Sequence, residues 1–536
     1  MKKVHGVAAS SFLPLSGRLI QTFPVHMITR LFSAALRGVD AQEVEVEVNA
    51  RGADKPLVII VGLPDAAVRE SSQRVTSAIG ASALFLADGV KTVNLAPADL
   101  KKEGPSFDLP IALAMIAACG DKPFDCEDCC VVGELGLDGA VRPVKGVLSI
   151  ALEAKQRGRL RVIVPEANAP EAAVIEGIQV IPVRNLRQAW DFLNGEVIIP
   201  PFKLDRRAFF ESHRGYEVDF DEVKGQHSVK RALEVAAAGN HNILMIGPPG
   251  TGKSMLAKRI PTIMPDMTEE EAIETTKIHS ITGLLDQKRA FLTTRPFRSP
   301  HHTISDAGLL GGGTNPGPGE VSLAHHGVLF LDELPEFRRS TLEVLRQPLE
   351  DRTVTISRAA GSLTFPASFM LVVAMNPCPC GFYGDLKREC RCSVRQIENY
   401  RQKISGPLLD RIDLHVEVPL VDFKELSNGA TGEKSDVIRE RVLAAKQVQL
   451  ERFKKASNTT NAAMGSRQVR QHCALDAEGS GYLEHAMEMM NFSARAHDRI
   501  LKVARTLADL GGSPNIRAND VLEAIQYRSL DRKLFN

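Results

Sequence analysis

The chain has 536 residues, of which 44% are hydrophobic and 24% charged, and its 66 Lys and Arg residues nearly balance 65 Asp and Glu residues. At roughly 150 residues per domain, this length predicts three or four domains and excludes a single small module. No uninterrupted apolar run approaches the roughly 20 residues that span a bilayer, so we expect no membrane partner. A formal charge of +1 excludes a protein that coats nucleic acid through its overall charge, and such binding would need local basic patches.

Cysteine usage and the N-terminal segment bear on where the protein works. Nine cysteines without a regular framework fit a reducing compartment, and we expect a cytoplasmic protein. Residues 1–39 contain no Asp or Glu, as in some targeting segments, but Pro14, Gly17 and Arg18 interrupt the apolar stretch. We therefore expect residues 1–26 to be an extension without a functional role.

The N-terminal third of the sequence mixes strand and helix patterns. Period-two alternation at 43–48 predicts a strand with one solvent-facing side, and the apolar run at 57–61 predicts a buried strand. Further strands are predicted at 92–95 and 161–164, and helices at 65–81 and 110–118. We expect a mixed α/β domain over residues 27–195 and a linker over 196–215.

The rest of the chain predicts a second α/β domain and a helical domain. Short, continuously apolar runs at 241–246, 328–331 and 369–374 are typical of central strands in a parallel sheet covered on both faces. We expect this domain to occupy residues 216–425. Apolar residues at helical spacing after that point predict a helical domain over 426–536.

A glycine-rich loop lies between the first of these strands and a segment of helical character. It fits G-x-x-x-x-G-K-[ST], and its residues are Gly247, Pro248, Pro249, Gly250, Thr251, Gly252, Lys253 and Ser254. Backbone N–H groups of such a loop and the following helix N-terminus face the β- and γ-phosphates of a nucleotide. Lys253 supplies a positive charge to those phosphates, and Ser254 supplies a ligand to Mg²⁺.

Polar residues follow the other two predicted strands. Asp332 and Glu333 end the second strand, which suits Mg²⁺ binding by Asp332 and polarisation of a water by Glu333; alone, the pair also fits a solvated turn. Asn376 ends the third strand and can orient the same water. Arg411 lies between two aspartates, either as a local salt bridge or as an arginine finger for a neighbouring subunit.

The order of these motifs resembles the AAA+ ATPases, within them the clade of magnesium-chelatase ATPase subunits and MCM helicases, and most closely the ComM/YifB family of Mg-chelatase-like proteins. The resemblance covers nearly all of residues 27–533. Besides the phosphate loop, the blocks that carry it are residues 61–70, 297–302, 331–337, 376–381 and 406–413.

The resemblance implies an α/β fold with three parts: a Lon-protease/S5-like N-terminal domain, an AAA+ P-loop core with a parallel sheet, and a C-terminal helical lid. It implies ATP and Mg²⁺ as cofactors. It assigns Glu333 to catalysis, Asn376 to the first sensor and Arg411 to the finger. Ser493-Ala-Arg495 is similar to the second sensor, with Arg495 as its reporter, and residues 223–226 lie where this class borders the adenine.

Two inserts are also implied by the resemblance. Residues 301–320 fall where this clade inserts a loop in its second helix, and residues 351–365 where it inserts a β-hairpin that lines the pore of a ring. Arg352 and Arg358 are then the residues expected to contact DNA, unless both inserts are solvated loops. Members of the ComM/YifB family are described as hexameric helicases that drive branch migration during DNA uptake by transformation.

That description implies an ATP-dependent DNA motor that binds single-stranded or branched DNA and acts as a homohexamer. The alternative is an ATPase subunit that remodels a protein or inserts metal, as magnesium chelatase does, without acting on DNA. A protease is a further alternative, because Ser106 matches the position of the Lon nucleophile. Leu148 stands where Lon has its catalytic Lys, which favours a protease relic used for assembly or DNA contact.

Four cysteines form a C-x-C-x₉-C-x-C pattern on one segment. They are Cys378, Cys380, Cys390 and Cys392. Four thiolates suit tetrahedral Zn²⁺, although C-x-x-C spacing is commoner. The sequence leaves a structural zinc ion and four free thiols as the alternatives.

Overall fold

The computed structural model describes residues 28–530, apart from 54, 121–125, 287–290, 314–315, 359–360, 386–387, 422–431, 455–459 and 491. The predicted extension over 1–26 and the predicted boundary between 425 and 426 lie outside the described residues. Two compact units form. The first combines residues 43–143 with 183–199 and the start of the chain, and the second combines 36–42, 144–182 and 200–536.

The first unit is a mixed α/β fold. Neighbouring strands run in the order β3-β4-β2-β1-β5, with β2 antiparallel to β4 and β3 parallel to it. The elements of this unit are β1 (Ile28–Arg37), β2 (Asp40–Arg51), β3 (Leu57–Val61), α1 (Ala66–Ala81), β4 (Val90–Ala96), α2 (Asp108–Ala117), β5 (Cys129–Val131), β6 (Glu134–Leu135), β7 (Val141–Arg142) and α5 (Leu186–Leu193). Alternate residues Val44, Val46 and Val48 of β2 are buried, which confirms the period-two prediction.

Strand β3 corrects one expectation. Its residues 57–61 form a strand as predicted, but the strand lies at the edge of the sheet and is not buried. Leu57, Ile59 and Val61 are 52%, 41% and 42% exposed. A continuous apolar run shows that a segment favours a strand, but it does not show whether other elements cover both faces.

Helix α1 begins at a side-chain N-cap, and helix α2 begins at a buried carboxylate with side-chain partners. The Asp65 side chain accepts a hydrogen bond from the Val68 N–H, as an N-cap does. Asp108, fully buried at the start of α2, accepts bonds from Ser71 and from Arg74 Nε at 2.9 Å. The Arg74 charge thus compensates the buried carboxylate.

The second unit is built on a five-stranded parallel sheet in the order β11-β14-β17-β10-β18. The strands are β10 (Ile243–Ile246), β11 (Phe297–Arg298), β14 (Val328–Leu331), β17 (Met370–Met375) and β18 (Leu414–Glu417). Ile243 and Met245 of β10 join one buried cluster, while Leu244 and Ile246 join another. Both faces of the sheet are therefore covered, as the continuous apolar runs predict.

Helices cover this sheet and complete the unit. Those near the sheet are α7 (His227–Gly239), α8 (Lys253–Ile263), α9 (Glu269–Thr282), α10 (Asp306–Leu310), α11 (Glu320–Leu323), α12 (Arg339–Glu343), α13 (Arg346–Asp351), α14 (Val394–Arg401) and α15 (Gly406–Leu409). A hairpin of β15 (Thr353–Arg358) and β16 (Gly361–Pro366) connects α13 to β17 and confirms the predicted insert. The remaining elements are α3 (Val147–Gln156), β8 (Arg161–Pro165), α4 (Ala169–Ala172), β9 (Gln179–Val183), α6 (Arg206–Ser212), β12 (Gly311–Gly312) and β13 (Gly317–Pro318).

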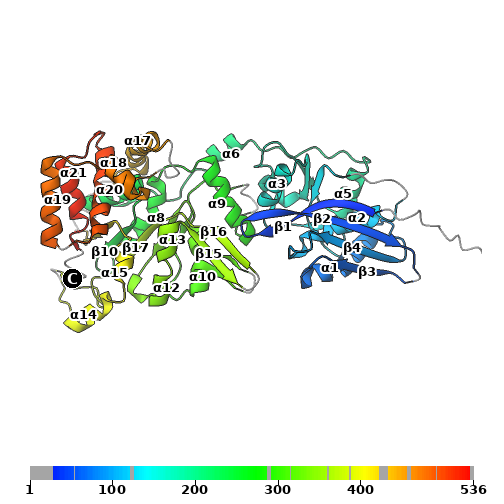
Figure 1. The fold of residues 1–536 in the computed structure, drawn as a ribbon, viewed down its shortest axis with the longest axis horizontal. Helices are drawn as coiled ribbons and strands as arrows, with labels where there is room; N and C mark the ends of the chain where they lie inside the picture. The colour runs from blue at the N-terminus through cyan, green and yellow to red at the C-terminus, as the bar shows by residue number, and fades with distance from the viewer. Residues whose placement is uncertain are drawn as a thin grey trace, which may run out of the picture. The chain divides into compact units, whose positions relative to one another are not determined.

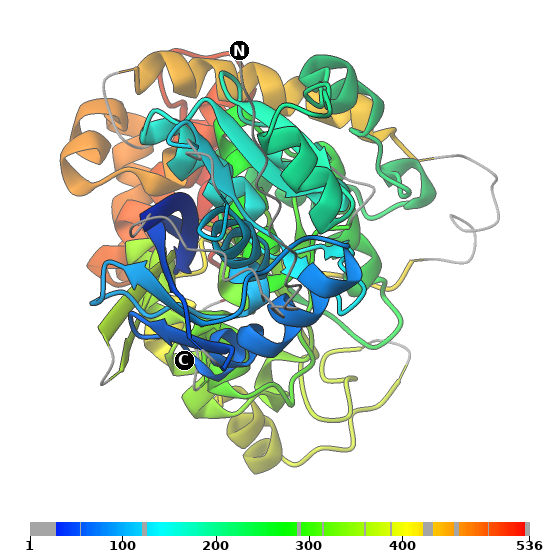
Figure 2. The same cartoon turned by 90° about the vertical axis from the view of Figure 1, so that its right-hand side faces the viewer.

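The C-terminal part is helical. It comprises α17 (Ser435–Arg452), α18 (Ser466–His472), α19 (Ala477–Met490), α20 (Ala494–Leu510) and α21 (Ala518–Gln526), which stay grouped in Figure 1 and Figure 2. Ile438, Val442 and Ala445 form the buried stripe of α17, as their spacing predicts. None of the helices in the described ranges combines the length and apolar character needed to cross a membrane.

Candidate functional site

The phosphate loop connects the C-terminal end of β10 to the first residue of α8. Gly250 and Gly252 both have φ of +82°, a conformation that side chains with a Cβ rarely adopt. The Gly247 N–H donates to the Met375 carbonyl at 3.2 Å, which joins the loop to the end of β17. The loop therefore has the strand–turn–helix context that its sequence motif requires.

Lys253 and Asn376 meet at the centre of this loop. Lys253 Nζ donates to the carbonyls of Gly247 at 2.7 Å and Pro248 at 2.9 Å, and to Asn376 Oδ1 at 3.2 Å. Burial lowers the pKa of Lys253, and the charges of Asp332 and Glu333 partly oppose that shift. The ends of β10 and β17 thus bring together a cation and an amide that are 123 positions apart in the sequence.

Oxygen ligands for a magnesium ion lie beside the lysine. Ser254 Oγ donates to Asp332 Oδ2 at 2.5 Å, so a hydroxyl and a carboxylate from α8 and the end of β14 share one position. Hard oxygen ligands of this kind suit Mg²⁺, so these residues fit the ion. Glu333 follows with φ of +52° and a side chain that is 55% exposed, so its carboxylate faces solvent.

His302 is a neighbour of Glu333 to which the sequence assigns no role. Its Nδ1 lies 3.7 Å from Glu333 Oε2. The histidine belongs to the 297–302 block, which follows β11 at the edge of the same sheet. In the sequence, His302 was recognisable only as part of the 297–302 block that carries the family resemblance, and nothing there predicted its contact with Glu333.

Gln226 borders the loop from the opposite side. It has φ of +53° before α7, and its Nε2 donates to the Thr251 carbonyl at 2.9 Å and the Pro419 carbonyl at 3.1 Å. This side chain ties the phosphate loop to the segment after β18. The structure thus places Gln226, the last residue of the 223–226 segment, in contact with the phosphate loop.

Arg411 and Arg495 do not join this cluster. Arg411 is 6% exposed, forms an ion pair with Glu350, and donates from Nη1 to the Pro407 carbonyl at 2.5 Å. Its carbonyl accepts a bond from Asn242 Nδ2 at 2.8 Å, just before β10 begins. Arg495 is exposed in the first turn of α20.

The two arginines expected to contact DNA have different surroundings. Arg358 is exposed at the end of β15, and a Cβ built on Gly312 of the second-helix insert would lie 3.5 Å from its Nη2. Arg352 is only half-buried at the base of the hairpin, where its carbonyl accepts the Ala367 N–H at 2.8 Å. The turn residues 359 and 360 lie outside the described residues.

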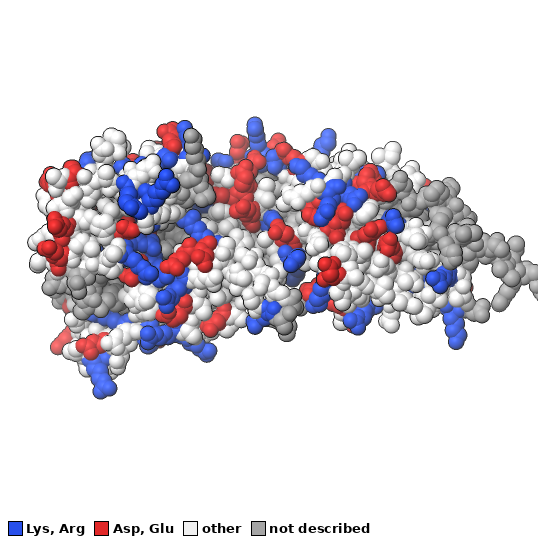
Figure 3. Space-filling model, in the orientation of Figure 1, with Lys and Arg blue, Asp and Glu red and all other residues white. Residues whose placement is uncertain are grey.

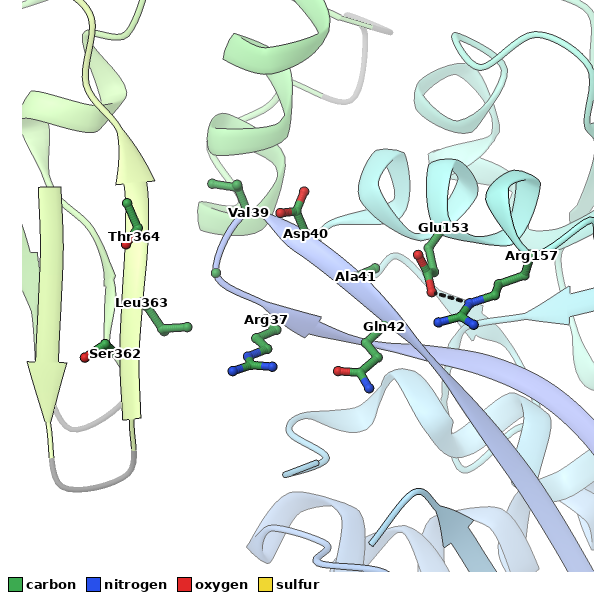
Figure 4. A pocket seen from close by; sticks show the side chains of 11 residues that line it. Arg37, Val39, Asp40, Ala41, Gln42, Glu153, Arg157, Ser362, Leu363 and Thr364 are labelled. Atoms are coloured by element: carbon green, nitrogen blue, oxygen red, sulfur yellow. Dashed lines mark hydrogen bonds and ion pairs between the residues drawn. The ribbon is translucent and has the colours of Figure 1, made fainter. Parts of the chain in front are cut away.

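A pocket of about 370 Å³ lies beside this hairpin (Figure 4). Ser362, Leu363 and Thr364 of β16 line one side, and Arg37 at the end of β1 and Gln42 near the start of β2 line the other. Arg157 of the same pocket pairs with Glu153, whereas Arg37 is exposed. Positive and negative side chains are interspersed on the face drawn in Figure 3, so basic groups act here as local positions and not as a broad patch.

The four cysteines of the C-x-C-x₉-C-x-C segment come together. Sulfur atoms lie 3.4 Å apart for Cys378–Cys380, 3.7 Å for Cys378–Cys390 and 3.6 Å for Cys380–Cys390, and all four, Cys392 included, lie within 4.8 Å of one another. A tetrahedral Zn²⁺ with Zn–S bonds of about 2.3 Å separates its sulfurs by about 3.8 Å. These thiols therefore fit the ion. Gly381 packs directly against Pro249, so the cluster also buttresses the phosphate loop.

A second group of metal-ligating types is a hydrogen-bonded cluster. His325 Nδ1 accepts the Ser368 N–H at 3.0 Å, so the proton of its neutral ring resides on Nε2. That Nε2 lies 3.3 Å from Glu274 Oε2, and His326 Nε2 lies 3.0 Å from the same oxygen. Burial lowers the pKa of His325, which keeps the ring neutral. A metal at Nε2 would displace the proton that this arrangement requires, so the cluster is structural.

The position of the Lon nucleophile gives no support for proteolysis. Ser106 lies in a short 3-10 turn, and the Gly133 N–H donates to its carbonyl at 3.0 Å. Leu148, which stands where Lon has its lysine, is fully buried in α3. A serine needs a base or a lysine of lowered pKa to act as a nucleophile.

A phosphate loop, an acidic strand end and a polar strand end at one edge of a parallel sheet define a P-loop ATPase of the AAA+ type. The family model described as "Magnesium chelatase, subunit ChlI" matches residues 219–426. Models described as "Subunit ChlI of Mg-chelatase" and "Magnesium chelatase, subunit ChlI C-terminal" match residues 44–168 and 432–528.

Curated relatives extend this similarity over the whole chain. The uncharacterised protein YifB of Escherichia coli is 43% identical over 506 residues, which cover 94% of this chain and 97% of YifB. The competence protein ComM of Haemophilus influenzae is 43% identical over 515 residues, 94% of this chain and 98% of ComM. The archaeal Lon protease of Methanocaldococcus jannaschii is 36% identical over 107 residues, 20% of this chain and 15% of that protein. The chain belongs to the ComM/YifB family of Mg-chelatase-like ATPases.

Proposed function

We propose that the chain is an ATP-dependent DNA motor that works as a ring of six identical subunits and remodels single-stranded or branched DNA. The observation that carries the proposal is the position of the β15–β16 hairpin. It lies in the chain between β14, which ends in Asp332 and Glu333, and β17, which ends at Asn376. The hairpin leads directly into β17, and α12 and α13 connect it to the end of β14, so a change at the phosphates can reach it from both strand ends.

The position of Arg411 supports assembly into a ring. It lies beside Asn242, before β10, whereas the phosphate loop follows the other end of that strand. The four residues of β10 span about 13 Å at about 3.3 Å per residue, so Arg411 cannot reach the γ-phosphate of its own subunit from this edge. An arginine finger at this position would serve the nucleotide of a neighbouring subunit.

Arg358, Arg37 and the polar face of the hairpin support DNA as the substrate. Thr355 and Thr364 join across the strands at 3.0 Å and Ser357 and Ser362 at 2.8 Å, which forms an exposed ladder of hydroxyl groups. Hydroxyl and guanidinium groups are typical partners of phosphate oxygens in a nucleic-acid backbone. The relative named competence protein ComM agrees with a role in DNA uptake, and we extend that role to this chain as part of the proposal.

Within this proposal each residue of the ATP site has a defined task. ATP and Mg²⁺ supply the phosphoryl group and the metal charge when bound. Lys253 holds the phosphates, Ser254 and Asp332 hold the ion, and Glu333 accepts a proton from the attacking water. Asn376 orients that water, Arg411 stabilises the developing charge from a neighbouring subunit, and Arg495 reports the state of the nucleotide to the lid.

The test is ATP hydrolysis measured without DNA, with single-stranded DNA and with forked DNA. We expect DNA to stimulate the wild type and Glu333→Gln to lose at least about 100-fold in kcat, because it removes the general base. Arg358→Ala should lose the stimulation and keep the basal rate. Arg339→Ala is the matched control, since Arg339 is an exposed arginine at the start of α12.

A second outcome would favour the alternative function. If hydrolysis depends on Glu333 but is the same with every DNA, the ATPase assignment stands and the motor assignment is wrong. An ATPase that remodels a protein or inserts metal would then be the better description. Migration of a synthetic four-way junction by the wild type, and its loss in Arg358→Ala, would separate branch migration from simple DNA-stimulated hydrolysis.

The cysteine cluster is proposed to hold one structural zinc ion per chain. Metal analysis of the purified protein should find zinc, and a Cys390→Ser, Cys392→Ser double variant should lose it. Cys473→Ser is the control, because Cys473 is buried in the helical region away from the cluster. The proposal would be contradicted if the purified wild type contained no zinc, had four titratable thiols in the cluster, and was as stable as the double variant.

A further inference from the structure

The side chain of Arg411 is held inside its own subunit. Its Nη2 pairs with the carboxylate of Glu350, and its Nη1 donates to the Pro407 carbonyl at 2.5 Å. Arg411 is 6% exposed, whereas the side chain of its partner Glu350 is 54% exposed. The carboxylate therefore lies toward solvent, and the guanidinium lies beneath it. In this position the guanidinium is turned to its own subunit and shielded from a neighbouring one.

One nitrogen of Arg411 lacks a partner in this position. Among the described residues, Arg411 Nε is buried and donates no hydrogen bond. The large majority of buried polar side-chain atoms in folded proteins have a hydrogen-bond partner, because a buried donor without one has lost its bonds to water. Phosphate oxygens accept two parallel N–H bonds from one guanidinium, so a γ-phosphate can satisfy the donor that this position leaves idle.

The main chain of Arg411 is fixed, in contrast to its side chain. The Arg411 carbonyl accepts a bond from Asn242 Nδ2 at 2.8 Å, and Asn242 Oδ1 accepts the Leu371 N–H at 2.8 Å. These bonds attach the Arg411 backbone to the starts of β10 and β17. Leu409 and Ile412, on either side of it, are buried in one hydrophobic cluster. Release of the guanidinium therefore requires a rotation of one side chain and leaves the sheet as it is.

The ion pair between Glu350 and Arg411 is a weak restraint. A pair with an exposed member contributes little to stability, because water screens the exposed charge. Glu350 belongs to the last turn of α13, which ends at Asp351. A modest displacement of this turn is enough to separate the two charges, so the contact suits a switch.

The β15–β16 hairpin is attached to the turn that carries Glu350, and α13 contacts β15 (Figure 1). Arg352 follows α13 with φ of +57°. Its N–H donates to the Pro348 carbonyl at 3.0 Å and closes the helix, and its carbonyl accepts the Ala367 N–H at 2.8 Å and closes the base of the hairpin. Displacement of the hairpin by a bound strand would therefore reach Glu350 through a single residue.

We propose that Glu350 makes an autoinhibitory contact that holds Arg411 inside its own subunit, and that displacement of the hairpin releases the arginine to the γ-phosphate bound by a second copy of the chain. The inference rests on the proposed motor function, because it takes Arg411 as the finger and the hairpin as the DNA contact. It adds Glu350 as the positioning residue that connects the two. Hydrolysis is then slow until DNA engages the hairpin, since each subunit withholds its finger from the next.

The first experiment measures ATP hydrolysis by Glu350→Gln, which removes the charge of the contact and keeps the size of the side chain. We expect this variant to be several-fold faster than the wild type without DNA and to gain correspondingly less from DNA. KM for ATP should stay the same, because Arg411 and its partner lie at the edge opposite the phosphate loop. The matched control is Glu343→Gln, which breaks the 2.8 Å pair of Glu343 with Arg346 and should leave the DNA-free rate unchanged.

The second experiment uses mixed subunits. A Lys253→Ala chain can donate a finger but lacks the lysine for its own ATP, and an Arg411→Ala chain can hydrolyse ATP only with a donated finger. Adding Glu350→Gln to the Lys253→Ala chain should raise the rate of the mixture several-fold. Adding it to the Arg411→Ala chain should change nothing, since that chain has no finger to release.

The outcomes separate the autoinhibitory contact from the finger and from the motor. A DNA-free rate of Glu350→Gln at or below that of the wild type overturns the contact, and the finger still stands if the mixture of Lys253→Ala and Arg411→Ala hydrolyses ATP. If Arg411→Ala alone keeps the wild-type rate, the finger is wrong and the contact falls with it. If Glu350→Gln is faster and this gain requires Arg411, but DNA does not stimulate the wild type, the contact stands and the motor function is wrong.

Discussion

The two edges of the five-stranded sheet give charged side chains two different kinds of surroundings. At one edge, the phosphate loop of residues 247–254 presents backbone N–H groups, and Lys253 adds a charge. At the other edge, side chains from three distant segments, those of Arg295, Arg352 and Lys446, line a cavity. The first arrangement is encoded in eight consecutive residues, whereas the second exists only after the chain has folded. The comparison shows why one of them is visible as a motif and the other is not.

Charge is also balanced differently at the two edges. Burial lowers the pKa of Lys253, and the charges of Asp332 and Glu333 oppose that shift. The phosphate-loop edge therefore contains its own acidic partners for the lysine. In the cavity, Glu271 is paired with Arg295. A magnesium ion suits the first edge because of its carboxylate, whereas the carboxylate in the cavity is already held by an arginine.

The largest expected effect comes from Arg411, which would connect the two edges between subunits. Arg411→Ala should lower kcat by about 1000-fold or more, the typical contribution of an arginine finger. Mixing Arg411→Ala with Lys253→Ala subunits should restore hydrolysis, because an intact phosphate loop then meets an intact finger from the other variant. ATPase assays of mixtures at several ratios measure this recovery. Mixtures that remain inactive at all ratios would contradict action between subunits.

Asp413 tests how the helical lid is fixed at the cavity edge. It is 1% exposed and accepts from His241 Nδ1 at 2.9 Å and Arg499 Nη1 at 2.5 Å. Asp413→Asn should cost about 3–5 kcal/mol of unfolding free energy, because it leaves the Arg499 guanidinium without its buried anion. Burial raises the pKa of Asp413, but Arg499 and His241 lower it by more than burial raises it. The net shift of the Asp413 pKa is therefore downward.

This shift fixes the sign of the acid dependence. The stabilisation from Asp413 is fully present above the ordinary aspartate pKa and is lost as the pH falls toward the lower pKa of the folded state. Urea unfolding at several pH values should show a wild type that loses its advantage over Asp413→Asn in acid. An advantage that is constant with pH would contradict the ionised pair.

Lys446, which lines the cavity from α17, gives the opposite dependence. Burial lowers its pKa from 10.5 in the unfolded chain to about 8 in the folded one, so between these values the unfolded state binds more protons. Unfolding free energy should therefore rise with pH over this window, by up to about 1.4 kcal/mol per pH unit. Lys446→Met should remove the slope. Urea unfolding of both proteins at each pH measures this effect.

The smallest effect is expected at Arg37 in the pocket beside the hairpin. Arg37→Ala should weaken single-stranded DNA binding several-fold and lower the dependence of affinity on salt by about 0.7 in logarithmic slope, the value for one phosphate contact. Arg339→Ala should change neither quantity. Binding measured by fluorescence anisotropy at several salt concentrations provides the slope. An unchanged slope would remove Arg37 from the DNA-binding surface.

Much of the fold could be predicted from periodicity and local chemistry. The strands at the ATP site, the helix with its stripe of Ile438, Val442 and Ala445, and the hairpin all form as expected. The exposure of β3 could not be predicted, because its apolar run looks the same whether it lies at the centre or at the edge of a sheet. The predicted linker over 196–215 contains a helix, α6, which begins after its N-cap Asp205.

The candidate site divides in the same way. The sequence by itself determined the phosphate loop, the acidic end of β14 and the four clustered cysteines, because each depends on residues that are close in the chain and on local backbone geometry. Only the tertiary structure decided that Arg411 lies at the edge opposite the phosphate loop, and that Arg295, Arg352 and Lys446 share one cavity. These placements depend on how distant segments pack against the two faces and two edges of a single sheet, and no spacing in the sequence records that packing.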